Sequence, residues 1–307
     1  MRILVVGAGA TGGYFGGRLL EAGRDVTFLV RPRRAEILAR SGLSIRSSQG
    51  DVDLPAPPTI LASGLRPGFD AVLLSCKAYD LEGAIDSFAP AVGPETLVVP
   101  LLNGMRHLDV LDQRFGAERV LGGTCFISSQ LGDDGRVVHR SDVHELTFGA
   151  REAAQRPKAE ALSAAMQGAR FTARMSEDIL QDMWEKWAFL ATFAGITCLM
   201  RASIGDVMAA GGVGLIGSLL EECRTIAAAS GRPPREEYLA WVRGVLTKEG
   251  SPLTASMLLD VERGAPTEAD HILGDLLRRA EPSEDPAGLL RIAYTALKAY
   301  EVRRLRE

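Results

Sequence analysis

The sequence contains few cysteines and histidines, 4 of each among 307 residues. The cysteines form no C-x-x-C pair, and neither residue type shows the close spacing that zinc ligands or redox pairs require. We therefore expect no metal site. We interpret the cysteines as small buried residues of a protein from a reducing compartment, because a chain of this length needs no disulfides to fold.

Long apolar runs and an excess of basic charge are also missing. The charge-free apolar stretch at residues 187–200 is shorter than the roughly 18 to 20 residues needed to cross a bilayer. The N-terminus lacks the cleavage-site pattern of a signal peptide. The formal net charge is -4, so the chain offers a polyanion no basic excess to bind. These absences argue against membrane and nucleic-acid partners and favour a cytoplasmic location.

The pattern of the chain changes once along its length. Up to about residue 175, short β-branched runs alternate with helical patterns, which is typical of βαβ units on a parallel sheet. From residue 176 onward helical periodicity dominates. We predict an α/β fold with a Rossmann-type dinucleotide-binding domain at residues 1–175 and an all-α domain at residues 176–307.

The expected elements follow from the same patterns. Strands are predicted at residues 2–6, 25–30, 71–75, 96–100 and 120–127, with a helix at 11–22. Residues 136–140 and 145–148 are predicted to form a hairpin, because residues 133–135 tolerate a positive φ. Helices of the second domain are predicted at 179–199, 214–229, 234–248, 254–262, 267–279 and 287–302.

The first strand is followed at once by the sequence G-A-G-A-T-G, which opens the first helix. In this pattern Gly7 permits a tight turn, Gly9 lets the backbone approach a pyrophosphate, and Gly12 allows close packing of helix on strand. Ala10 and Thr11 begin the helix, whose N-terminus supplies donors and partial positive charge. The alternative is a glycine-rich turn without a ligand. The order of strand, motif and helix favours a dinucleotide site.

The end of the second strand indicates which dinucleotide is bound. An NAD site usually has an acidic residue there, which accepts hydrogen bonds from the ribose 2′-hydroxyl. This chain has none, and offers R-P-R-R from Arg31 onward. Guanidinium groups suit a 2′-phosphate, so we predict NADP, with NADPH as the reduced form and Arg31 as the preferred partner. A solvated basic turn is the alternative.

Two polar residues follow later strands of the predicted sheet. Lys77 comes after the strand at 71–75, and Asn103 comes after the strand at 96–100. Ligands of open α/β sheets gather at the carboxyl ends of the strands, so each side chain is a candidate to contact cofactor or substrate. On local sequence alone, Lys77 could equally reach solvent, and Asn103 with the following glycine could be a turn.

Three further candidates lie in the predicted helical domain. Lys186 is the last charge before an apolar stretch, and it shares a helix side with apolar residues three and four positions away. Partial burial disfavours the charged form of an amine, which suits a proton donor near neutral pH. The alternative is a lysine whose stem packs while its head reaches water. Glu268 near a helix start and the small polar residue Ser256 are unremarkable on local sequence alone.

Several motifs together resemble the ketopantoate reductases, also called 2-dehydropantoate 2-reductases. They occur in the family's order over nearly the whole chain. The matching stretches are GAGATGG at residues 7–13, SCKAYD at 75–80, LNGM at 102–105, WEKWA at 184–188, SMLLD at 256–260 and PTEAD at 266–270.

The resemblance implies an NADPH-dependent reduction of 2-dehydropantoate to (R)-pantoate in pantothenate and coenzyme A biosynthesis. Lys186 would donate the proton to the carbonyl oxygen. Lys77 and Asn103 would lie beside nicotinamide and substrate, and Glu268 and Ser256 would hold the substrate's polar groups. The expected partner is a small 2-oxo acid in the cleft between the domains, and a homodimer remains open as the assembly.

One departure from the family pattern concerns the substrate. Many members carry asparagines one and two turns after the catalytic lysine, whereas this chain has Leu190 and Ala194. A site without those hydrogen-bonding groups discriminates less well for a substrate hydroxyl. One alternative is therefore a related NADP-dependent reductase of another 2-oxo acid. The other is an inactive NADP-binding sensor, against which the presence of Lys186 and Glu268 argues.

Overall fold

The computed structural model describes residues 1–280 and 288–306 and divides into two compact units. The first unit comprises Met1–Leu102 and His107–Leu180. The second comprises Asn103–Arg106 and the chain from Gln181 onward. The turn that carries Asn103 thus belongs with the helices of the C-terminal half, although it follows a strand of the first unit.

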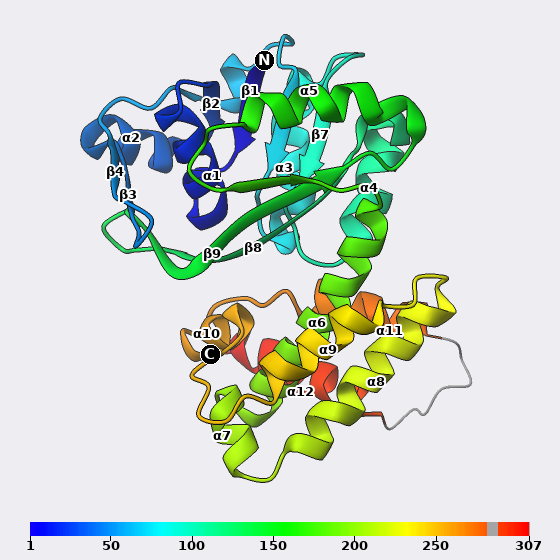
Figure 1. Cartoon of the computed structure of the whole chain (residues 1–307). Helices are drawn as coiled ribbons and strands as arrows, with labels where there is room; N and C mark the ends of the chain where they lie inside the picture. The colour runs from blue at the N-terminus through cyan, green and yellow to red at the C-terminus, as the bar shows by residue number, and fades with distance from the viewer. Residues whose placement is uncertain (281–287, 307) are drawn as a thin grey trace. The chain divides into compact units, whose positions relative to one another are not determined.

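The first unit is built on a parallel sheet in the strand order β5-β2-β1-β6-β7 (Figure 1). Its strands are β1 (Arg2–Val6), β2 (Asp25–Leu29), β5 (Thr59–Ile60), β6 (Ala71–Leu74) and β7 (Leu97–Pro100). Most of their residues are buried, as expected for a parallel sheet covered on both faces. The chain leaves β1 toward β2 on one side and returns to β6 on the other, so ligand-binding loops are expected at the carboxyl end of β1.

Helices connect and follow these strands. They are α1 (Ala10–Glu21), α2 (Pro32–Ser41), α3 (Leu81–Phe88), α4 (Arg106–Phe115) and α5 (Arg156–Met166). The strands predicted at 2–6, 25–30, 71–75 and 96–100 and the helix predicted at 11–22 are confirmed to within one residue at each end. The α/β class predicted for this part of the chain is confirmed as well.

A second sheet has the order β10-β9-β3-β4, with β8 also paired to β9. Its strands are β3 (Leu43–Arg46), β4 (Val52–Leu54), β8 (Gly122–Leu131), β9 (Val137–Gly149) and β10 (Thr172–Met175). The predicted hairpin of residues 136–140 with 145–148 is wrong, because both segments belong to the single strand β9. Residues 133–135 instead connect β8 to β9, and these two strands pair antiparallel.

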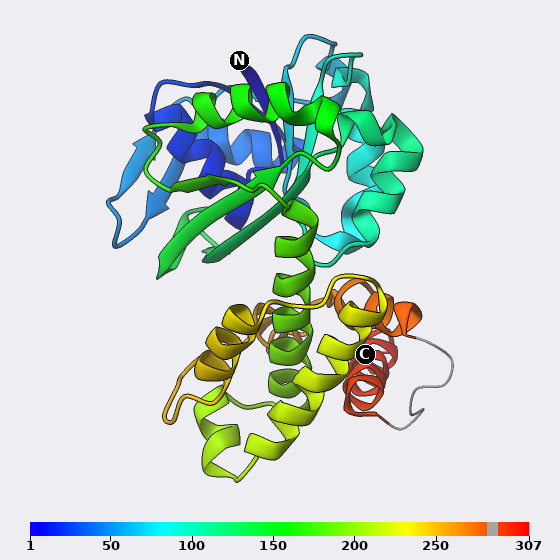
Figure 2. The same ribbon diagram turned by 45° about the vertical axis from the view of Figure 1, so that its right-hand side comes forward.

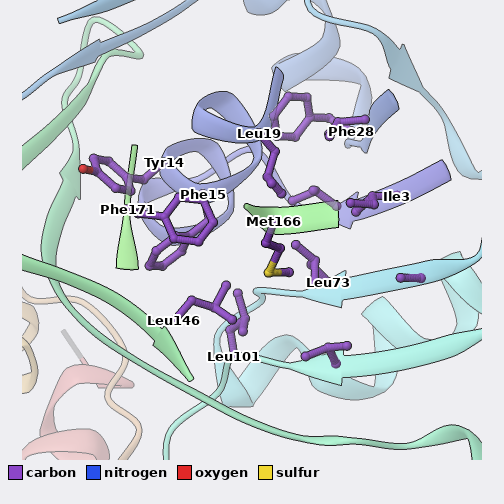
Figure 3. Close-up of a cluster of buried hydrophobic side chains, with 14 of the residues drawn as sticks. Ile3, Tyr14, Phe15, Leu19, Phe28, Leu73, Leu101, Leu146, Met166 and Phe171 are labelled. Carbon is purple, nitrogen blue, oxygen red and sulfur yellow. The ribbon is translucent and has the colours of Figure 1, made fainter. Parts of the chain in front are cut away.

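Helix α1 packs against strands of both sheets, and its small residues make this possible. A Cβ atom at Gly16 would lie 2.6 Å from the Phe28 ring of the first sheet, and one at Gly17 would lie 2.7 Å from Ile45 of the second. Figure 3 shows the resulting core, in which Tyr14, Phe15 and Leu19 of α1 lie among side chains from several elements of this unit.

The second unit is helical throughout the described residues. It comprises α6 (Ile179–Met200), α7 (Ile204–Ala209), α8 (Val213–Ala229), α9 (Glu236–Leu246), α10 (Ser256–Glu262), a π-helical turn (Asp270–Gly274), α11 (Asp275–Arg279) and α12 (Leu289–Arg304). The green helix α6 runs through the middle of this unit in Figure 2. The all-α prediction is confirmed, and the first residue of the helix predicted at 287–302 lies outside the described residues. In the part of the chain that the structure describes, no helix is long and apolar enough to span a membrane.

Candidate functional site

The glycine turn between β1 and α1 is closed on one side and open on the other. Gly7 has a φ of +94°, a conformation that favours glycine. A Cβ atom at Gly12 would lie 2.2 Å from both the Gly7 carbonyl oxygen and Ser75 Oγ, so the helix packs there at the closest distance glycine allows. A Cβ atom at Gly9 would meet nothing within 4 Å. The turn therefore has free space next to the backbone of Gly9, where a ligand could approach.

The start of α1 is suited to an anion. Gly9 is the N-cap, so no side chain caps the first backbone N–H groups, and the first turn contains no acidic residue. Ala10 and Thr11, the first two helical residues, are half-buried. An uncapped helix N-terminus presents donors and partial positive charge. The donors and the space beside Gly9 together fit the pyrophosphate of a dinucleotide.

Arg31 lies directly after β2 as the N-cap of α2, and its side chain is 76% exposed. Its Nη2 atom donates a hydrogen bond of 3.0 Å to Asp80 Oδ1. Asp80 follows β6 by only a few residues, as does the half-buried Lys77. The ion pair therefore joins the loops at the carboxyl ends of β2 and β6, and a 2′-phosphate bound by Arg31 would compete with Asp80.

Lys186 and Asn103 lie together in the second unit. Lys186 is on α6 and is only 4% exposed, and its Nζ donates a hydrogen bond of 3.3 Å to Asn103 Oδ1. Asn103 is the only asparagine in the chain. The next residue, Gly104, has a φ of +77°, and a Cβ atom there would lie 2.8 Å from the His271 carbonyl oxygen. The structure thus brings the predicted lysine and asparagine into direct contact on a turn that tolerates only glycine after Asn103.

The residue before the lysine has a buried and fully engaged carboxylate. Glu185 accepts hydrogen bonds from the backbone N and Nε of Arg235, both at 2.8 Å, and from Arg235 Nη2 and Gln181 Nε2. These hydrogen bonds to Glu185, with a further one to Asp182, raise the pKa of Arg235 above its usual value. The interaction fixes α6 against the start of α9 next to Lys186. Arg235 could not be identified from the sequence, because nothing local links it to a helix fifty residues earlier.

Glu268 is 7% exposed and lies just before the π-helical turn. Its carbonyl oxygen accepts hydrogen bonds from the backbone N of His271 and of Ile272, at 3.0 and 2.9 Å. The indole Nε1 of Trp187 donates to the Ile272 carbonyl oxygen at 2.8 Å, which ties this turn to the residue after Lys186. π-Helical turns occur often at functional sites. Helix 267–279 was predicted as one regular helix, whereas the structure begins it with this wider turn.

A further candidate, Ser256, lies on α10. It is the first residue of α10 and is exposed. Within the described residues it forms no hydrogen bond with Lys186 or Asn103. The proposal that it contacts substrate therefore stays a prediction.

The helix face beyond Lys186 is apolar. Leu190 is half-buried one turn later, and Ala194 is buried two turns later. The rings of Phe189 and Phe193 stack on the same helix at 5.6 Å. Neither Leu190 nor Ala194 can donate a hydrogen bond to a substrate hydroxyl.

Among the described residues, no three histidine, cysteine, aspartate or glutamate side chains are grouped so that they could hold a metal ion. None of the four cysteines forms a disulfide. Burial raises the pKa of the Cys198 and Cys223 thiols to about 12, so both are inert residues of the helical core.

Comparison with known proteins covers both units. The family model described as "Ketopantoate reductase PanE/ApbA" matches residues 3–153, and the model of the family's C-terminal region matches residues 178–301. The uncharacterized oxidoreductase YkpB of Bacillus subtilis is 37% identical over 302 residues, covering 98% of this chain and 99% of YkpB. A 2-dehydropantoate 2-reductase of Nostoc sp. is 25% identical over 283 residues, 90% of this chain and 88% of that one.

Solved structures agree with these matches. The 2-dehydropantoate 2-reductase of Geobacter metallireducens is 28% identical, with a TM-score of 0.87 over 97% of this chain and 99% of that one. A D-mandelate dehydrogenase in a ternary structure with NADH and anilino(oxo)acetate has the same fold, at a TM-score of 0.87, 20% identity and coverage of 99% of this chain and all of that one. The chain therefore belongs to the ketopantoate reductase family of oxidoreductases.

Proposed function

We propose that this protein reduces 2-dehydropantoate to (R)-pantoate with NADPH, a step that leads to pantothenate and coenzyme A in the cytoplasm. The observation that carries the proposal is the contact between the buried Lys186 ammonium and Asn103 Oδ1. The family match supports an oxidoreductase acting with a nicotinamide dinucleotide. The basic residues after β2 support NADPH over NADH.

One group of residues is proposed to bind the cofactor and another to bind the substrate. Gly7, Gly9 and Gly12 form the turn that would hold the cofactor, with Lys77 and Arg31 at the ends of neighbouring strands. When bound, NADPH supplies the hydride that adds to the keto carbon.

Lys186 is the proposed general acid. Its ammonium stabilises the negative charge that develops on the carbonyl oxygen, and then transfers a proton to that oxygen. Asn103 accepts a hydrogen bond from Lys186 and so limits the directions in which the amine can point. The buried carboxylate of Glu268 accepts a hydrogen bond from a substrate hydroxyl, and Ser256 binds another polar group of the substrate.

A second candidate substrate is supported by the apolar face beyond Lys186. Leu190 and Ala194 offer no hydrogen bond to a hydroxyl, so a branched 2-oxo acid without one would lose nothing there. The reaction and the roles of Lys186 and Asn103 would be unchanged.

Initial rates with a panel of substrates test both proposals. The purified protein is mixed with NADPH and, in turn, 2-dehydropantoate, 2-oxoisovalerate, 2-oxoisocaproate and phenylglyoxylate, while the absorbance of the reduced nicotinamide is followed. We expect the highest kcat/KM with 2-dehydropantoate. A higher kcat/KM with another acid would replace the pantoate assignment by the second candidate. Absence of turnover with every acid, together with measurable NADPH binding, would favour the sensor.

A further inference from the structure

Arg34 contacts the glycine turn directly, although the sequence pattern pointed to Arg31. It is the third residue of α2 and is half-buried. Its Nε donates a hydrogen bond of 2.9 Å to the carbonyl oxygen of Ala8, the residue between the first two glycines of the motif. Its Nη1 donates to the Gly135 carbonyl oxygen at 3.1 Å. One guanidinium thus joins the glycine turn to the tip of the β8–β9 hairpin, entirely within the first unit.

The charge of this guanidinium is not balanced by a protein anion. Within residues 1–280 and 288–306, no carboxylate forms an ion pair with Arg34, and its Nη2 is buried without a hydrogen-bond partner. Desolvation lowers the pKa of Arg34 from its usual value, yet the group remains cationic at neutral pH. By contrast, the fully buried Arg18 pairs with Glu21 at 3.1 Å, and Arg31 pairs with Asp80.

A partly buried cation with no counter-ion is unfavourable unless an anion completes the arrangement. The place is informative, because the guanidinium touches the same turn whose uncapped helix N-terminus and open Gly9 side fit a phosphate. Both features contribute positive potential to one short segment of backbone.

We propose that Arg34 is a further cofactor-binding residue, the counter-ion of the dinucleotide pyrophosphate at the glycine turn. Since NADH and NADPH share the pyrophosphate, Arg34 strengthens the binding of both. Arg31, at the end of β2, is expected to act on the 2′-phosphate and so to distinguish the two. The inference rests on dinucleotide binding alone, and it would survive a change of the 2-oxo acid.

A purely structural role is the competing explanation, because Arg34 also holds the hairpin tip through Gly135. Two substitutions separate charge from hydrogen bonding. Arg34→Gln keeps an N–H donor of shorter reach but removes the charge, whereas Arg34→Lys keeps the charge but loses the planar fork. Arg40→Gln is the matched control, since Arg40 is an exposed arginine in the last turn of the same helix.

The experiment measures the Kd of NADH and of NADPH for the four proteins at one salt concentration, by fluorescence of the bound reduced cofactor. We expect Arg34→Gln to raise both Kd values about tenfold, because the attraction between the guanidinium charge and the pyrophosphate is lost. Arg34→Lys should raise them less, and Arg40→Gln by less than about twofold. The NADPH-to-NADH ratio of Kd should stay unchanged in Arg34→Gln.

Three results would overturn the proposal. Unchanged Kd values in Arg34→Gln would show that the positive charge of Arg34 does not contribute to dinucleotide binding. Equal losses in Arg34→Lys and Arg34→Gln would indicate the structural role instead. A loss of affinity confined to NADPH would indicate that Arg34 binds the 2′-phosphate instead of the pyrophosphate. Melting curves of the cofactor-free proteins check folding, and no turnover is needed, so the outcome is independent of whether 2-dehydropantoate is reduced.

Discussion

The ammonium of Lys186 donates a hydrogen bond to the amide oxygen of Asn103 across 3.3 Å, linking α6 to the turn that follows β7. The two residues are 83 positions apart in the chain. Both ends of this contact are held by backbone that has little freedom. Gly104 packs against the backbone of His271, and Glu185 is fixed by Arg235. The contact therefore has the rigidity expected of a group that positions a proton donor.

Removal of the amide tests this positioning. Asn103→Ala should lower kcat by roughly three- to tenfold, the equivalent of one lost hydrogen bond. If Asn103 acts through the lysine, the double variant with Lys186→Ala should be no slower than Lys186→Ala alone. Steady-state kinetics of the four proteins provide the cycle. Independent, multiplicative losses would show that Asn103 has a role of its own.

Two glycines of the turn should respond differently to the same methyl group. In Gly12→Ala the new Cβ would lie 2.2 Å from Gly7 O and Ser75 Oγ, so we expect a loss of about 1–3 kcal/mol in the free energy of unfolding. In Gly9→Ala the methyl enters open space, so the melting temperature should be kept while NADPH binding weakens. Thermal melts and Kd measurements check both. A Gly9→Ala protein with unchanged NADPH affinity would mean that the cofactor does not approach this backbone.

Arg31 should determine the choice between the two dinucleotides. Arg31→Gln removes a guanidinium that is suited to a 2′-phosphate and already exposed to solvent. We expect the Kd of NADPH to rise about tenfold while that of NADH changes little. Asp80→Asn is the reciprocal variant: freeing Arg31 from its carboxylate partner should tighten NADPH binding. Parallel changes in both cofactors after Arg31→Gln would assign the residue to another part of the dinucleotide.

A pair of histidines should make the stability of the first unit depend on pH. Tyr14 Oη and His144 Nδ1 are 2.6 Å apart, and the rings of His139 and His144 stack at 5.5 Å beside the buried Arg18. Desolvation lowers the pKa of both histidines, and His139 and Arg18 lower that of His144 further, while Asp142 and the Val143 carbonyl partly oppose this for His139.

The direction of this pH dependence follows from the number of protons that the folded and the unfolded protein bind. The unfolded chain, with histidines near 6.5, binds more protons than the folded protein below that pH. The stability contributed by the two neutral histidines is complete above about pH 6.5. It is lost as the pH falls through their lowered pKa values in the folded protein. The melting temperature should therefore drop between about pH 7.5 and pH 5.5, and the drop should be smaller in His144→Gln. An equal drop in both proteins would exclude the histidine as its source.

The parts of the fold that the sequence predicted are those fixed by local pattern. The strand–glycine–helix order around Gly7 and the long apolar helix after Lys186 are read within a few residues. The second sheet could not be predicted, because β9 finds its partners in β3, β8 and β10, which lie far apart in the chain. The prediction of a hairpin within residues 136–148 was wrong for the same reason. The strand that pairs with β9 is β8, which comes before the turn at residues 133–135.

The candidate site shows the same limit. Lys186 could be singled out from the apolar residues around it, and Asn103 from its place after a strand, but their contact is tertiary. The position of Arg31 directly after the second strand favoured it as the basic residue of the cofactor site. The residue that touches the glycine turn is Arg34, one helical turn later, because α2 directs that side chain back toward Ala8.

The most direct measurement is the effect of Lys186→Ala on kcat and on NADPH affinity, with the exposed Lys248→Ala as control. If Lys186 is the proton donor, kcat should fall about 10²-fold or more with the preferred 2-oxo acid, while the Kd of NADPH stays within about twofold. Lys248→Ala should match the unchanged protein in both. A Lys186→Ala protein with undiminished kcat would contradict the account.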